Sequence, residues 1–303
     1  MLALKRFRHK AARTRLRVPL IWLRNRGLGP NDVFIASYPR GGSTWTRFVL
    51  YEILAGESST FDNVNQGIPE IGIHRRARRL LPGEGRLIKT HEPYRKEYRR
   101  AVYIARDMRD VIFSQYAREK ELGILYDEFD AYLTKFLQGR ISGFGAWQDH
   151  VQTWLDSPLA RSGDLLILRF EDLKKDMESA VFRMLDFFGV GVEPDIVRAA
   201  IANNTLERMR QKEEQSQTLH QARSGEEGRF VRKGAVGGWR EKLSVEQLRL
   251  IDTYAGGGFH RLGYPLAAAV AADRNSAGPP AQLGLVRASE DQAAALSGRH
   301  GPQ

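Results

Sequence analysis

Glycines, hydroxyls and an arginine gather in one short stretch, Tyr38-Pro39-Arg40-Gly41-Gly42-Ser43-Thr44-Trp45. Glycines let a backbone approach an anion closely, and the amides at a helix N-terminus donate hydrogen bonds to it. The Ser43 and Thr44 hydroxyls can donate as well, and Arg40 adds a permanent positive charge. The stretch therefore predicts a loop that binds a phosphate-like group. Its spacing is not that of a Walker A motif, and taken alone it also fits a glycine-rich turn with a helix cap.

A second stretch, from Tyr103 to Tyr116, combines an arginine with a hydroxyl in a strand, turn and helix pattern. Arg106 follows the expected strand, and Ser114 lies about two turns into the expected helix. An arginine fork and a hydroxyl together suit a phosphate monoester. A structural ion pair between Arg106 and Asp110 is the alternative interpretation.

A histidine and a lysine follow another expected strand, in Ile88-Lys89-Thr90-His91-Glu92-Pro93. A lone histidine is more often structural or exposed than catalytic. A group that titrates near neutrality nevertheless suits removal of a proton from an acceptor. Lys89 beside it could stabilise charge on the phosphate oxygens of a leaving group, as positioned cations do in phosphoryl transfer.

Each of these stretches lies where an expected strand ends. Buried strands are expected at 32–37, 86–90, 101–105 and 165–168, with helical patterns at 44–54 and from the fourth strand through Phe188. This alternation predicts a single α/β domain with a mainly parallel central sheet flanked by helices and a P-loop-like anion-binding loop. Ligands of such folds bind at the carboxyl ends of the strands, and the motifs fall there.

The motifs resemble those of the PAPS-dependent sulfotransferases, which use 3′-phosphoadenosine-5′-phosphosulfate (PAPS). The first is similar to the phosphosulfate loop Y-P-K-S-G-T-T-W, with Arg40 and Gly41 in place of lysine and serine. The second is similar to Y-x-x-R-x-x-[KR]-D-x-x-x-S-x-Y. A third stretch, Arg232-Lys233-Gly234-Ala235-Val236-Gly237-Gly238-Trp239, is similar to R-K-G-x-x-G-D-W, with Gly238 in place of the aspartate. The three occur in the family's order between residues 32 and 265.

The resemblance implies how the donor nucleotide is bound. The 5′-phosphosulfate would be held by Arg40, Gly41, Gly42, Ser43 and Thr44. The 3′-phosphate would be held by Arg106, Ser114, Arg232, Lys233 and the backbone of Gly234. Adenine would contact Trp45, Phe170 in the place of a family tyrosine, and Thr205 in a stretch that resembles T-S-F-x-x-M. In that stretch Leu206 replaces the family's aromatic residue, and both Phe170 and Leu206 fit core or helix-cap roles equally well.

The resemblance also implies the reaction, which is in-line transfer of a sulfuryl group to a hydroxyl or amine. His91 would be the general base, and Lys89 and Arg40 would be the other catalytic residues. Two alternatives stay open. A P-loop-type nucleotide kinase would need a Walker lysine and a Mg²⁺-binding carboxylate. A catalytically inactive PAPS-binding protein is favoured only if the substitutions at Arg40, Gly41, Phe170 and Gly238 cripple turnover.

Composition limits the remaining possibilities. The chain of 303 residues has no cysteine, which excludes disulfides, thiol catalysis and cysteine-ligated metals. No metal-ligand cluster is visible, so PAPS is expected as co-substrate without a metal. No apolar run of about 18 residues and no secretory signal occur, so we expect a cytoplasmic protein without a membrane-spanning helix.

The net charge of +11 is concentrated at the N-terminus. Residues 1–31 are expected to be a basic extension that could contact an anionic membrane peripherally. Residues 32–265 would be the sulfotransferase domain, and residues 266–303, rich in Ala, Gly, Pro and Ser, a disordered tail. No nucleic-acid-binding signature is present. The acceptor would be a small molecule, carbohydrate or lipid, and the sequence leaves its identity and the oligomeric state open.

Overall fold

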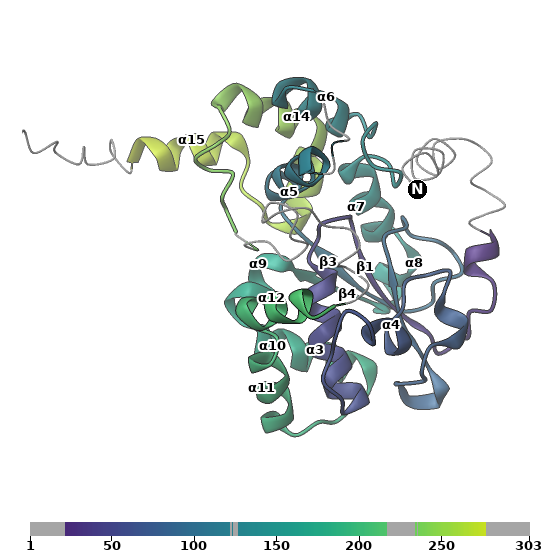
Figure 1. The fold of residues 1–303 in the computed structure, drawn as a ribbon. Helices are drawn as coiled ribbons and strands as arrows, with labels where there is room; N and C mark the ends of the chain where they lie inside the picture. Colours follow the sequence, from purple (N-terminus) through teal and green to yellow (C-terminus); the bar gives the residue numbers. More distant parts are fainter. Residues whose placement is uncertain (1–21, 122, 124–126, 217–233, 235, 277–303) are drawn as a thin grey trace, which may run out of the picture.

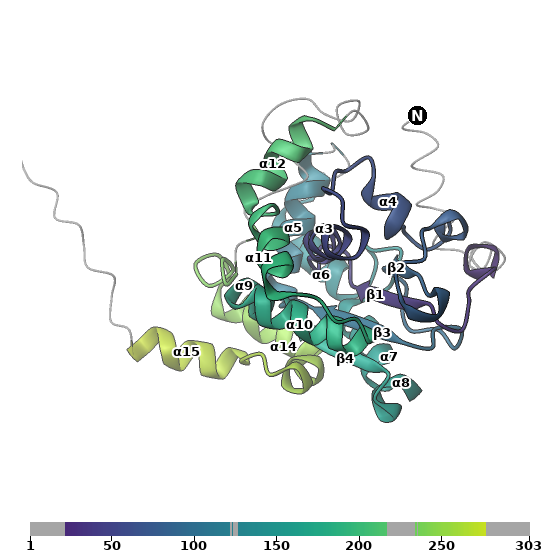
Figure 2. The same ribbon diagram turned by 90° about the horizontal axis from the view of Figure 1, so that it is seen from below.

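A parallel sheet forms the centre of the computed structural model, which describes residues 22–121, 123, 127–216, 234 and 236–276. Its four strands lie in the order β2-β1-β3-β4, and each pairing is parallel. They are β1 (Val33–Ser37), β2 (Leu87–Thr90), β3 (Ala101–Ala105) and β4 (Leu165–Arg169). The four expected strands are confirmed, with ends that differ by at most one residue. Figures 1 and 2 show helices on both faces, so the predicted α/β class is confirmed as well.

The strands form because short, continuous apolar runs can be buried on both faces of a parallel sheet. All five residues of β1 are buried, and so are all five of β3. Successive side chains of a strand point to opposite faces. Phe34 and Ala36 accordingly lie in one hydrophobic cluster, and Val33 and Ile35 lie in another. The sheet therefore separates two layers of core.

Helices of the described residues cover these layers (Figure 1). In chain order they are α3 (Ser43–Ala55), α4 (Val64–Gly67), α5 (Met108–Glu121), α6 (Phe129–Leu137), α7 (Trp147–Leu155), α8 (Pro158–Ser162), α9 (Phe170–Lys175), α10 (Met177–Phe188), α11 (Pro194–Ala202), α12 (Leu206–Glu214), α14 (Val245–Leu262) and α15 (Ala267–Ser276). Two short 3₁₀ helices are η1 (His74–Arg76) and η2 (Pro82–Glu84). Core residues of α3, α10 and α11 join the cluster of Val33, while those of α6, α7 and α14 join the cluster of Phe34. None of the helices in this part of the chain is long and apolar enough to cross a membrane.

The basic extension and the disordered tail were expected at the two ends of the chain, and the described parts of both are folded. Residues 22–31 pack on the domain, since Arg24 pairs with Glu92 at 3.1 Å and the Gly27 carbonyl accepts a hydrogen bond from Arg86 at 2.8 Å. The expected disordered tail begins instead as helix α15, in which Ala267 and Val270 are buried. Alanine is the best helix former, and the alanine content that suggested disorder also explains this helix. Residues 1–21 and 277–303 lie outside the described residues.

Candidate active site at the carboxyl edge of the sheet

The carboxyl ends of the four strands gather the expected site residues at one edge of the sheet. β1 ends at Ser37 and leads into a loop of residues 38–42, called the glycine loop below, and β2 is followed directly by His91. β3 is followed by Arg106 and β4 by Phe170. Because these parallel strands are neighbours, their carboxyl ends meet, and the stretches that follow them lie side by side.

The glycine loop is folded so tightly that its glycines are required. Gly42 has a φ of 94° and precedes the first residue of α3, and a side chain there would overlap the Phe170 ring. A Cβ atom at Gly41 would lie 2.8 Å from the Tyr38 carbonyl oxygen. The N-cap residue Gly42 has no side chain, so no N-cap hydrogen bond occupies the amides of the first turn of α3. Arg40 itself adopts a positive φ of 67°.

The first two motifs are in direct contact. Arg40 Nε donates a hydrogen bond to Ser114 Oγ at 2.9 Å, and Arg106 Nη1 donates to the Arg40 carbonyl at 3.0 Å. The Arg106 guanidinium lies 4.5 Å from the centre of the Phe170 ring, which is itself buried. Two arginines and a hydroxyl thus converge beside the glycine loop, an arrangement suited to anionic groups.

His91 is held as a neutral imidazole with one nitrogen available. Its Nδ1 lies 2.7 Å from the Ser37 carbonyl oxygen. A carbonyl can only accept, so Nδ1 carries the proton and Nε2 keeps its lone pair. Burial, together with the nearby Lys89 cation, lowers the His91 pKa well below its ordinary value. The imidazole is therefore neutral at pH 7, with an unprotonated Nε2, as a general base must be.

Lys89 lies in β2, two residues before His91, and its side chain is only 12% exposed. Burial lowers the Lys89 pKa to about 8, while the Glu70 carboxylate, 3.8 Å from Nζ, raises it and the Arg47 cation lowers it further. At pH 7 the ammonium form of such a group exceeds the neutral amine by about tenfold. Lys89 is therefore a cation at the site under neutral conditions.

Trp45 and the stretch around Thr205 meet at the side of the loop. Trp45 Nε1 donates to the Asn204 carbonyl at 2.7 Å, and Thr205 caps α12 by accepting from the Arg208 amide at 3.3 Å. The structure therefore brings together Trp45 and Thr205, two of the three residues expected beside adenine. Phe170 instead packs on the glycine loop and against Arg106.

The third stretch is described only in part, because Arg232 and Lys233 lie outside the described residues. Gly234 has a φ of 51°. Further along, the Gly237 amide donates to Asp110 Oδ2 at 2.8 Å, and the buried Trp239 ring lies 3.7 Å from the Arg109 guanidinium. The end of the third motif is thus anchored on the first turn of α5, beside the second motif.

Three supporting residues were not among those predicted: Ser37, Glu70 and Asp110. Ser37 directly precedes the first motif, and Asp110 lies within the second, so their positions in the motifs could have indicated them. Glu70 lies in a loop without a recognisable pattern, and only its parallel bridge to Lys89 in the folded chain brings it to the site. In the described part of the chain, no group of three or more His, Asp or Glu residues could hold a metal ion.

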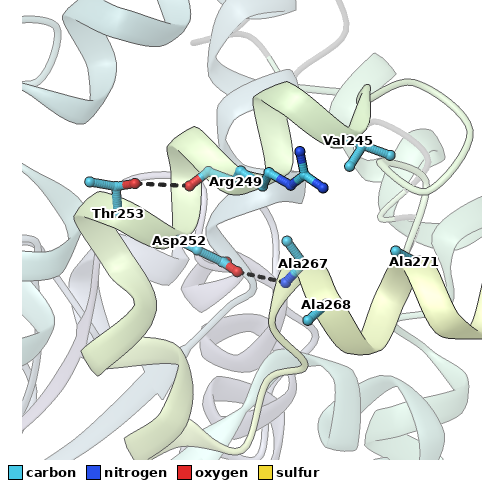
Figure 3. Close-up of a pocket in the computed structure, with 7 residues that line it drawn as sticks. All are labelled: Val245, Arg249, Asp252, Thr253, Ala267, Ala268 and Ala271. Carbon is cyan, nitrogen blue, oxygen red and sulfur yellow. Dashed lines mark hydrogen bonds between the residues drawn. The ribbon is translucent and has the colours of Figure 1, made fainter.

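A groove of about 430 Å³ lies elsewhere, between α14 and α15 (Figure 3). Arg249, Asp252 and Thr253 line it from α14, and Ala267, Ala268 and Ala271 line it from α15. Asp252 accepts a hydrogen bond from the Ala267 amide at 2.6 Å, which fixes the start of α15 on α14. None of its lining residues belongs to the candidate site.

Comparisons with known proteins agree on one family. A model of the sulfotransferase domain matches residues 30–263. Amine sulfotransferase of Oryctolagus cuniculus is 26% identical over 245 residues, which cover 73% of this chain and 78% of the relative. Flavonol 3-sulfotransferase of Flaveria bidentis is 28% identical over 257 residues, which cover 74% of this chain and 80% of the relative.

Solved structures show the same fold. Retinol dehydratase in complex with androsterone and the inactive cofactor PAP aligns with a TM-score of 0.65 and 20% identity, over 78% of this chain and 83% of that one. Mouse sulfotransferase SULT7A1 complexed with PAP aligns with a TM-score of 0.61 and 21% identity, over 78% and 87%.

Proposed function

The chain belongs to the PAPS-dependent sulfotransferase family, and we propose that it transfers the sulfuryl group of PAPS to a hydroxyl or amine of an acceptor. One observation supports this most directly. The glycine loop, the Arg40–Ser114–Arg106 contacts and a neutral His91 all meet at the carboxyl edge of the sheet. This arrangement supports the proposal, because sulfuryl transfer requires an anion-binding site beside a general base.

The residues present fit a nucleotide that carries phosphate groups at both the 3′ and the 5′ positions of its ribose. The glycine loop, whose Gly42 leaves no room for a side chain, would hold the 5′-phosphosulfate with the first amides of α3 and the hydroxyls of Ser43 and Thr44. Arg106 and Ser114 would bind the 3′-phosphate, joined by Arg232, Lys233 and the Gly234 backbone. Trp45 would stack on adenine beside Thr205.

PAPS, when bound, supplies a sulfuryl group attached to a phosphate leaving group. His91 Nε2 accepts the acceptor's proton while the acceptor oxygen or nitrogen forms its bond to sulfur. The bond between sulfur and the phosphate oxygen breaks, and its electron pair stays with that oxygen. Lys89, Arg40 and the α3 amides stabilise the resulting negative charge on 3′,5′-bisphosphoadenosine (PAP).

Ligand-dependent melting tests the proposal. PAP should raise the melting temperature far more than AMP does, because only PAP has the 3′-phosphate that Arg106 and Ser114 would bind. A ligand at a hundredfold excess over its Kd stabilises the native state by about 2.7 kcal/mol. Equal shifts with PAP and AMP would refute the donor assignment.

Turnover with PAPS on a panel of acceptors, read by mass spectrometry, separates an enzyme from an inactive binding protein. The names of the relatives indicate amines and flavonols as their acceptors. For this chain we propose a small-molecule acceptor, with carbohydrates and lipids included in the panel, and the cytoplasm as its location. No observation favours the nucleotide kinase, whose Walker lysine the loop lacks.

We also propose peripheral contact with an anionic membrane. The residues Trp22, Leu23 and Ile73 are 65%, 52% and 60% exposed. Arg75, two residues after Ile73, donates a hydrogen bond to the Leu23 carbonyl at 3.4 Å and so links the two stretches of chain. Exposed tryptophan with flanking arginine is typical of membrane interfaces. Trp22→Ser should reduce sedimentation with phosphatidylserine vesicles and leave turnover on a water-soluble acceptor unchanged. Equal sedimentation of the variant and the wild type would contradict the contact.

A further inference from the structure

A mostly buried lysine on α12 uses all of its hydrogen-bond donors close to the expected adenine site. Lys212 Nζ donates to Glu52 Oε1 at 2.7 Å, to Asn204 Oδ1 at 2.8 Å and to Ser59 Oγ at 3.0 Å. An ammonium group has three N–H donors, and each of them has a partner here. The Lys212 and Glu52 side chains are only 15% and 7% exposed.

The partner carboxylate is equally well satisfied. Glu52 Oε1 also accepts from the Ser59 amide at 3.0 Å and from the Ser59 hydroxyl at 2.7 Å, and Oε2 accepts from Asn203 Nδ2 at 3.2 Å. Burial raises the Glu52 pKa, but the hydrogen bonds from Lys212 and Ser59 outweigh it and leave the pKa below its ordinary value. Glu52 and Lys212 therefore form a charged pair in the protein interior.

This pair is connected to the expected adenine site through one residue, Asn204, which is fully buried. Its side-chain oxygen accepts from Lys212, and its side-chain amide donates to the Ala200 carbonyl at 2.8 Å. Its main-chain oxygen accepts the hydrogen bond from Trp45 Nε1 at 2.7 Å. The chain of contacts thus runs from Lys212 through Asn204 to the Trp45 indole.

Stability alone gives little reason for such a pair. Taking two charges out of water is costly, and well-packed apolar residues in the place of a buried ion pair are often as stable or more so. Buried, fully satisfied polar groups can instead specify one arrangement among several. Here the arrangement specified is the position of Asn204 relative to α3, which bears both Glu52 and Trp45.

We propose that Lys212, paired with Glu52, is a positioning residue for the base of the donor nucleotide: it holds Asn204, and through it the Trp45 indole, in the orientation that stacks on adenine. The inference rests on the proposed function, in which Trp45 contacts adenine. Lys212 itself contacts no nucleotide in this scheme.

The test compares two ligands that differ only in the base. PAP has adenine and both phosphates, while ribose 3,5-bisphosphate lacks the base. Lys212→Met keeps an unbranched side chain, one atom shorter, and removes its charge. It should weaken PAP binding about 5- to 150-fold, the range for loss of one base–aromatic stack. Binding of ribose 3,5-bisphosphate should change less than twofold. In kinetics, KM for PAPS should rise while kcat at saturating PAPS stays near the wild-type value.

Two further variants complete the design. Lys175→Met makes the same chemical change at an exposed lysine of α9 and should leave both affinities unchanged. Glu52→Gln keeps the shape of the side chain, removes its charge and should reproduce the selective loss of PAP affinity in a well-folded protein. In a Trp45→Phe background, which lacks the indole N–H, Lys212→Met should weaken PAP binding much less than it does in the wild type.

Unchanged PAP affinity in both Lys212→Met and Glu52→Gln would overturn the inference. A parallel loss for PAP and ribose 3,5-bisphosphate would overturn it too, because the pair would then support the whole site rather than the base. Failure of the wild-type protein to bind PAP at all is a different result, since it would refute the proposed function itself.

Discussion

The ion pair between Lys89 and Glu70 makes the pH dependence of turnover predictable. Burial and the Arg47 cation favour the neutral amine of Lys89, whereas Glu70 favours the ammonium. Glu70 is 42% exposed and Lys89 only 12%, so the dielectric constant of bulk water, about 80, gives a lower limit for the interaction of the pair. At 3.8 Å, Coulomb's law then gives about 1.1 kcal/mol, which corresponds to about 0.8 of a pH unit. Glu70→Gln should therefore lower the Lys89 pKa by at least about that amount.

The assay is kcat as a function of pH with both substrates saturating. In the wild type, activity should fall above pH 8, because the Lys89 pKa is about 8 and, in the proposed reaction, only the ammonium form stabilises the leaving group. The acid limb should lie well below pH 6.5, because the His91 pKa is lowered to that range. Glu70→Gln should move the alkaline limb to lower pH and leave the acid limb in place.

A matched variant controls for the loss of one negative charge. Glu84→Gln makes the same substitution at a side chain that is 80% exposed and pairs with Arg79, outside the site. It should leave both limbs where the wild type has them. An alkaline limb that stays in place in Glu70→Gln, or moves to higher pH, would refute the assignment of that limb to Lys89.

Three further substitutions test individual roles. His91→Ala should lower kcat about 10²- to 10⁴-fold and leave the calorimetric Kd for PAP near the wild-type value; a normal kcat would assign the proton to another group. Arg106→Ala should weaken PAP binding by about 1.5–3 kcal/mol in the same calorimetric assay, and an unchanged Kd would remove Arg106 from the 3′-phosphate site. Gly42→Ala should destabilise the protein by about 1–3 kcal/mol, since the new methyl group meets Phe170 at a positive φ; a wild-type unfolding free energy would show that the loop relaxes.

The sequence was sufficient for those parts of the fold that local patterns determine. β1 and β3 are short apolar runs, and each is followed by a turn and a helix that begins within a few residues. The glycine loop has a backbone conformation that requires glycine, and the glycines in the sequence were enough to predict it. His91 and Arg106 could be placed at the same edge because both directly follow strands of a parallel sheet.

The other contacts depend on residues far apart in the chain, which no local pattern connects. Lys212 and Glu52 are separated by 160 residues, and Gly237 and Asp110 by 127. In α12, Lys212 looks like an ordinary surface lysine, and only the packing of α3 and the loop around Ser59 makes it a mostly buried one. For α15 the composition was misleading, because alanine is frequent both in disordered tails and in helices.

In the proposed reaction, the hydrogen bond between His91 and the Ser37 carbonyl determines how the general base is regenerated. Nδ1 is committed to an acceptor that cannot take up a proton, so the ring exchanges protons through Nε2 alone. The neighbouring His150 provides no relay in the described structure, because its Nε2 donates to the His91 main-chain carbonyl at 3.1 Å and its Nδ1 is 3.0 Å from the Tyr103 hydroxyl. In the proposed reaction, each proton taken up must therefore depart on the side where the acceptor entered. His91 would then lose its proton only once the sulfated product has left, so product release and deprotonation of the base are coupled in the turnover cycle.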